Sequence, residues 1–153
     1  MDRRSPIEKA RAYSFLLLKF RLRSEGELYE RLKRKKFDEE TIDATLAFLK
    51  GKGFLDDGYF AKSWVNSRLK KNLGSRRIKE ELRLKGINRE IIERELRRIK
   101  ADYPEAEVVK GILNSKFKKI SSEDPLKAKR RIYAYLLRRG FSSEVVLEAL
   151  NNL

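Results

Sequence analysis

The side chains in this sequence that could do chemistry are mainly arginines and lysines. Two clusters place several of them within a few positions: Lys70-Lys71 with Arg76-Arg77-Lys79, and Lys127-Lys129-Arg130-Arg131. Crowding of like charges is costly unless an anion lies nearby, so the clusters predict an anionic partner. The plain alternative is that these side chains only solubilise the outer faces of helices.

Catalytic and metal-binding chemistry has little support in the composition. The chain has no cysteine and no histidine, which excludes disulfides and thiolate metal sites and removes the commonest general base. Adjacent Asp56 and Asp57 could suggest a metal pair, but carboxylates at a helix start are far more often caps. No glycine-rich phosphate loop occurs. We therefore expect no enzyme activity, no cofactor and no metal.

The charge of the chain is strongly positive and unevenly distributed. Its 153 residues include 38 Lys and Arg against 23 Asp and Glu, a net charge of +15. The surplus falls in three segments, 1–36, 68–100 and 110–139. This balance favours nucleic acid over an anionic membrane as partner. No apolar run is long enough to span a bilayer, so we expect a cytoplasmic protein that does not bind membranes.

These basic segments must be positioned by helices, because hydrophobic residues follow helical spacing throughout the chain. We expect a first helix to open at Ser5-Pro6, and a second to open at Ser24 with a capping box to Glu27. The buried face of the first helix is predicted to be Ala12, Tyr13, Leu16, Leu17 and Phe20. Further caps are predicted at Asp38, Asp56 or Asp57, Ser75, Asn88 and Ser142.

The anchors of the second and third helices of each group recur at the same offsets in three copies. They are Leu28, Leu32, Phe37, Ile42, Leu46 and Leu49; Ile78, Leu82, Ile87, Ile92, Leu96 and Ile99; and Ile132, Leu136, Phe141, Val146, Leu150 and Leu153. The pattern predicts an all-α, elongated and curved tandem array of three three-helix, helix-turn-helix-like repeats, at 1–53, 54–101 and 102–153. Units of this size need stacking on neighbours for stability.

A set of positions in the middle repeat resembles the central signature of the RecX family, the bacterial regulators of the RecA recombinase. These positions are Leu55, Asp56, Asp57, Phe60, Ala61, Val65, Arg68, Gly74, Arg77, Ile78, Glu81, Leu82, Lys85, Gly86 and Ile87. One departure is Trp64, where the family leads us to expect Phe. The apolar role of that position is kept.

The resemblance implies a regulatory binding protein that acts along the RecA–DNA filament, usually by restraining RecA. We expect a monomer that prefers filamentous RecA and binds single- or double-stranded DNA with weak dependence on sequence. The residues predicted to contact DNA or the filament are Arg68, Lys70, Lys71, Arg76, Arg77, Lys79, Arg83, Lys85, Lys127, Lys129, Arg130, Arg131, Arg138 and Arg139.

A second class of function stays open, because a three-helix unit with a basic second helix also resembles a helix-turn-helix reader of duplex DNA or a transcription regulator. Such a reader needs side chains that recognise base edges. The second and third helices of each repeat have almost no Asn or Gln, which favours phosphate or acidic protein as the ligand.

Overall fold

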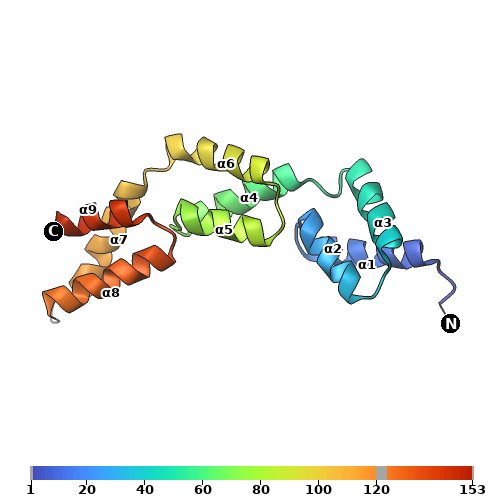
Figure 1. The fold of residues 1–153 in the computed structure, drawn as a ribbon, viewed down its shortest axis with the longest axis horizontal. Helices are drawn as coiled ribbons and strands as arrows, with labels where there is room; N and C mark the ends of the chain where they lie inside the picture. Colours follow the sequence, from blue (N-terminus) through green and yellow to red (C-terminus); the bar gives the residue numbers. More distant parts are fainter. Residues whose placement is uncertain (1, 120–123, 153) are drawn as a thin grey trace. The chain divides into compact units, whose positions relative to one another are not determined.

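The structure is a computed structural model that describes residues 2–119 and 124–152, with side chains of 117–119 outside the description (Figure 1). These residues form nine helices and no strand. The helices are α1 (Pro6–Phe20), α2 (Glu25–Arg34), α3 (Glu39–Gly51), α4 (Asp57–Lys70), α5 (Ser75–Leu84), α6 (Arg89–Asp102), α7 (Glu105–Lys119), α8 (Pro125–Arg138) and α9 (Ser143–Asn151). The predicted all-α class is confirmed.

No helix in the described part of the chain combines the length and the apolar character needed to cross a membrane.

Most of the predicted caps hold the helix starts. Ser5 accepts the Glu8 backbone N–H, and Ser24 forms the full capping box with Glu27. Asp38 and Ser142 accept the backbone N–H groups three residues further on. The Asn88 side chain accepts the Glu90 N–H at 2.8 Å. Each cap satisfies a backbone donor that the helix leaves free, which explains why these elements begin where the sequence indicates.

The predicted buried face of α1 was wrong in part. Ala12, Leu16 and Phe20 are exposed, and Phe20 is 75% accessible. The buried stripe consists of Ala10, Ser14 and Leu17, with Tyr13 packed beside it. The hydroxyl of Ser14 donates to the Ala10 carbonyl at 2.8 Å, so its polar group is satisfied inside the core. Counting only apolar side chains therefore shifted the face by part of a turn.

The chain divides into two compact units. The first contains residues up to Ser63 together with Leu82–Ile92, and the second contains Trp64–Glu81 together with the chain from Glu93 onward. In the first unit α1, α2 and α3 pack around a core with Leu28, Leu32 and Ile42 fully buried. In the second unit α7, α8 and α9 pack around Val109, Leu136 and Phe141. The division into three repeats at the stated boundaries stays a prediction.

The predicted anchors are buried, apart from two that are half-buried. Those two are Phe37 and Leu96. Leu153 lies outside the described residues. Burial at matching offsets in all three groups of helices explains why the pattern could be read from the sequence.

The start of α5 differs from the prediction and is held from a distance. Ser75 is the first helical residue rather than the cap, and its backbone N–H donates to the Glu105 carboxylate at 2.8 Å. The N–H groups of Gly74 and Arg76 donate to the carbonyls of Arg139 and Gly140, at 2.8 and 3.1 Å. The turn between α8 and α9 therefore caps α5 within the second unit.

The first unit repeats this arrangement at the start of α2. The Glu25 N–H donates to the carboxylate of Asp57, the first residue of α4, at 2.8 Å. The Ser24 hydroxyl donates to the Lys85 carbonyl at 2.7 Å. A Cβ on Gly26 would lie 2.8 Å from that same carbonyl oxygen, so this close approach requires glycine. We call these two arrangements, one in each unit, the docked turns.

Candidate nucleic-acid interface

The predicted contact residues are distributed unequally between the two units. Arg83 and Lys85 belong to the first unit, and the other twelve belong to the second. Most of the twelve lie on α5, on α8 or close to their ends. The second unit thus holds both basic clusters that the sequence indicated.

Two of the predicted residues, Arg68 and Arg77, have carboxylate partners within the second unit. Arg68 Nε lies 2.9 Å from Glu81 Oε1, and its guanidinium lies over the Trp64 ring, 4.4 Å from the ring centroid. Trp64 Nε1 donates to the same oxygen at 3.2 Å. Arg77 Nε is 3.5 Å from Glu81 Oε2. The network links α4 to α5, and the charge of Arg68 is paired with Glu81 inside it.

Lys85 and Arg139 occupy the docked turns. Lys85 Nζ lies 3.2 Å from Glu27 Oε2, with both side chains largely buried. The Arg139 guanidinium donates to the backbone carbonyls of Lys71 and Asn72. Lys85 therefore reaches from its turn to α2, which that turn caps, whereas Arg139 reaches from its turn to the loop between α4 and α5. The predicted contact of these two residues with DNA or RecA stays a prediction.

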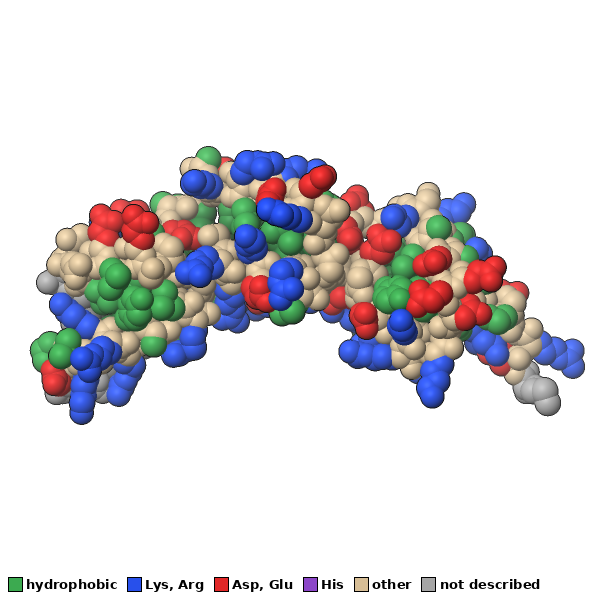
Figure 2. Space-filling model, viewed as in Figure 1, with side chains coloured by type: hydrophobic (Ala, Val, Ile, Leu, Met, Phe, Trp, Pro, Cys, Tyr) green, Lys and Arg blue, Asp and Glu red, His purple; other side chains and the backbone are tan. Residues whose placement is uncertain are grey.

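The remaining predicted residues of the second unit are mostly exposed. The exposed ones are Lys70, Lys71, Arg76, Lys79, Lys127, Arg130, Arg131 and Arg138, whereas Lys129 is half-buried. Figure 2 shows Lys and Arg side chains gathered over α8, at the lower left of the view. A groove between α5 and the end of α8 is lined by Arg76, Arg77 and Arg138, and also by Glu80 and Glu81. This groove and the exposed lysine and arginine side chains form a surface suited to a row of phosphates.

Aromatic stacking on bases has weak support at α8. Tyr133 and Tyr135 are half-buried and pack against the core of the second unit. The ring of Tyr135 has the Lys116 ammonium 3.8 Å from its centroid and the Arg139 guanidinium at 5.5 Å. A ring engaged by cations is less available to a base. The exposed lysine and arginine side chains of α8 are therefore the stronger candidates for contact with nucleic acid.

The acidic residues that could suggest a metal site have structural partners. Asp56 accepts the Tyr59 N–H at 3.0 Å, so it caps α4 as predicted. Asp57 accepts from Glu25, and burial raises the pKa of its carboxyl despite that hydrogen bond. Within residues 2–119 and 124–152, no group of three acidic side chains is close enough to hold a metal ion.

A further set of arginines was missed at the level of single residues. Arg21, Arg23, Arg31 and Arg34 line one concave site in the first unit, together with Lys85. The excess charge of segment 1–36 was the available signal in the sequence. It could not show that residues from the loop before α2 and from α2 itself converge.

Sequence models of three domains match this chain in order. They are described as the first, second and third three-helix domains of RecX, and they match residues 10–49, 56–96 and 105–150. The regulatory protein RecX of Haemophilus influenzae (strain PittEE) is 35% identical over 133 residues, which are 86% of this chain and 86% of that protein. The regulatory protein RecX of Mycobacterium sp. (strain KMS) is 34% identical over 148 residues, which are 94% of this chain and 80% of that protein.

Two solved structures share the fold. A crystal structure of regulatory protein RecX superposes with a TM-score of 0.80 at 25% identity, covering 97% of this chain and 72% of the other. The crystal structure of RecX from Lactobacillus salivarius has a TM-score of 0.81 at 22% identity, covering 97% and 96%. The second of these likenesses concerns the fold alone.

Proposed function

Because this chain belongs to the RecX family of regulatory proteins, we propose that it regulates the RecA recombinase by binding along the RecA–DNA filament and restraining its activity. The observation that carries the proposal is that a chain which matches this family also has exposed lysine and arginine side chains on α5 and α8 of the second unit. A filament on DNA presents phosphates and protein surface side by side. Exposed guanidinium and ammonium groups bind such phosphates with little dependence on sequence.

The DNA-binding part of this proposal is tested by titrating labelled single strands and duplexes with the chain over a range of salt concentrations. If roughly 4 to 6 phosphates are contacted on duplex, log K should fall against log salt with a slope of about −4 to −5. A flat salt response would contradict the proposal. Strong discrimination between duplex sequences would favour the helix-turn-helix reader instead.

A matched pair of variants locates the contact. Arg76→Glu with Lys79→Glu reverses two exposed charges on α5, and Arg94→Glu with Arg97→Glu reverses two exposed charges on α6. The change in net charge and the spacing along the helix are equal. The α5 variant should lose most of its affinity for every sequence and reduce the salt slope by about 2, and the α6 variant should lose less. Equal losses would mean that only net charge matters.

A further inference from the structure

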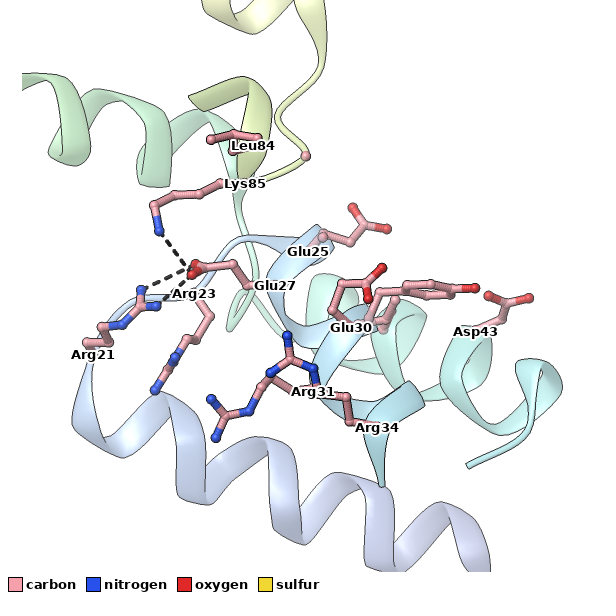
Figure 3. Close-up of a pocket in the computed structure, with 14 residues that line it drawn as sticks. Arg21, Arg23, Glu25, Glu27, Glu30, Arg31, Arg34, Asp43, Leu84 and Lys85 are labelled. Carbon is pink, nitrogen blue, oxygen red and sulfur yellow. Dashed lines mark hydrogen bonds and ion pairs between the residues drawn. The ribbon is translucent and has the colours of Figure 1, made fainter. Parts of the chain in front are cut away.

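The concave site in the first unit is built by four segments and has a volume of about 650 Å³; one of them is α3, which contributes Asp43 and Leu46. The loop between α1 and α2 contributes Arg21 and Arg23, α2 contributes Arg31 and Arg34, and the turn after α5 contributes Leu84 and Lys85. Figure 3 shows the four arginines and Lys85 on one side of the site, and Glu25, Glu30 and Asp43 on the other. The basic side chains thus share one wall.

Glu27 organises this wall. Arg21 binds it with two hydrogen bonds of 3.2 and 2.6 Å, and Lys85 lies 3.2 Å from it (Figure 3). Burial opposes the charged form, but the hydrogen bonds from Arg21, the Ser24 backbone and Lys85 lower the pKa of Glu27 to about 2. The carboxylate therefore stays ionised and holds Arg21 and Lys85 in place.

Arg23, Arg31 and Arg34 have no carboxylate partner among the described residues. The Nε of Arg23 is buried and has no hydrogen-bond acceptor in the part of the chain that the structure describes. Arg31 Nε donates only to the hydroxyl of Tyr13, at 3.3 Å, which orients its guanidinium without neutralising it. Burial and the neighbouring charges of Arg21 and Arg31 lower the pKa of Arg23, although the nearby Glu27 carboxylate opposes this shift. A buried donor and unmatched charges are both costly until an anion binds.

The acidic wall does not cancel these charges. Glu25 is paired with Lys50 at 3.3 Å, on the far side from the arginines. Glu30 and Asp43 remain on that wall and would repel an anion placed near them. An anion is therefore directed to the edge formed by Arg23 and Arg31.

We propose that Arg23 and Arg31, with Arg34 at the rim, bind a phosphodiester group of a nucleic acid strand. Guanidinium forks match the paired oxygens of a phosphate, and here two forks approach from different elements. Lys35 and Lys36 follow Arg34 along the chain and are exposed, which extends the basic path for neighbouring phosphates. This inference rests on the proposed binding to a filament on DNA and adds a contact in the first unit.

The test uses the full chain with Arg23→Gln and Arg31→Gln together. The control carries Lys19→Gln and Lys52→Gln, which remove two exposed charges from the same unit outside the site. Thermal melts establish that both variants fold. Affinity for a short labelled oligonucleotide is then measured against salt, in parallel with inorganic pyrophosphate and poly-glutamate as competitors. In the parent chain, the Nε–H resonance of Arg23, assigned with Arg23→Lys, reports occupancy directly.

We expect the site variant to lose about tenfold or more in affinity for the oligonucleotide and to reduce the salt slope by about 1 to 2, and the control to change little. The oligonucleotide should shift the Arg23 resonance, and poly-glutamate at equal charge should not. An unshifted resonance overturns the site, as does equal loss in the two variants. If only poly-glutamate shifts the resonance, the site binds an acidic protein segment, and the proposal of a phosphate ligand is overturned. If only pyrophosphate shifts it, the site binds free phosphate, and the proposal of a nucleic acid strand is overturned. If the parent chain binds no DNA, the proposed function is overturned as well. If the α5 variant loses affinity for DNA and the variant with Arg23→Gln and Arg31→Gln does not, only this inference is overturned.

Discussion

Replacing Gly140 with alanine should destabilise the second unit strongly, because the turn that contains Gly140 is docked on the start of α5. Gly140 is buried and has φ +98, a conformation that other residues rarely adopt. An added Cβ would lie 2.5 Å from the Arg77 backbone nitrogen and 2.8 Å from the Gly74 carbonyl oxygen. These atoms belong to the backbone, so they can move only if the turn leaves α5.

The magnitude follows from three contributions. The left-handed conformation costs about 1 to 2 kcal/mol for a residue with a Cβ. Overpacking typically adds about 1 to 3 kcal/mol. Moving the turn also weakens the two backbone hydrogen bonds to Gly74 and Arg76, each worth about 1 kcal/mol. Because relief of the clash and loss of these bonds are alternatives in part, we expect a total of about 3 to 5 kcal/mol.

Urea and thermal unfolding followed by circular dichroism measure this loss, and Gly111→Ala is the matched control in the same unit. Gly111 lies inside α7, and nothing lies within 4 Å of an added Cβ. Alanine there should stabilise the helix by up to about 1 kcal/mol. The two substitutions add the same methyl group and are expected to act in opposite directions. Similar unfolding of both variants would refute the docked turn.

Three further substitutions test separate parts of the structure. Folding lowers the pKa of Glu27 from 4.5 to about 2, so Glu27 contributes up to about 3 kcal/mol to the free energy of unfolding above pH 4.5, and this contribution is lost as the pH falls toward 2. Glu27→Gln should remove that part of the pH dependence of unfolding. An unchanged dependence on pH would contradict this role of Glu27. Leu82→Asp places a charge at a fully buried position and should cost several kcal/mol, which a parent-like melt would rule out. Glu105→Ala removes the acceptor of the Ser75 N–H and should cost about 1 kcal/mol, whereas Glu107→Ala, at an exposed neighbour, should cost less; equal costs would argue against the cap.

The parts of the fold that could be predicted depend on local chemistry. Ser24, Asp38 and Ser142 cap helices through contacts within three residues, and such signals survive without knowledge of the tertiary structure. The core anchors Leu28 and Ile132 were found because burial at helical spacing leaves a periodic pattern.

The parts that could not be predicted depend on residues distant in the sequence. Asp57 and Glu105 each cap a helix about thirty residues earlier, and only the packing of the helices brings them there. Ser14 can be buried because its hydroxyl donates to a carbonyl of the preceding turn. A polar residue type alone does not predict such burial. Arg23 and Arg31 converge from a loop and a helix, so spacing alone does not reveal their common site.

Regulation of RecA is tested most directly by comparing the affinity of this chain for assembled RecA–DNA filament, free RecA and bare DNA under one set of salt conditions, with DNA-dependent ATPase measured in parallel. Several contacts made together raise the effective concentration of each, so the filament should be bound on the order of 10² more tightly than free RecA. ATPase should fall at fewer than one chain per RecA. Equal affinity for filament and free RecA, or unchanged ATPase at saturating chain, would contradict the proposed regulation.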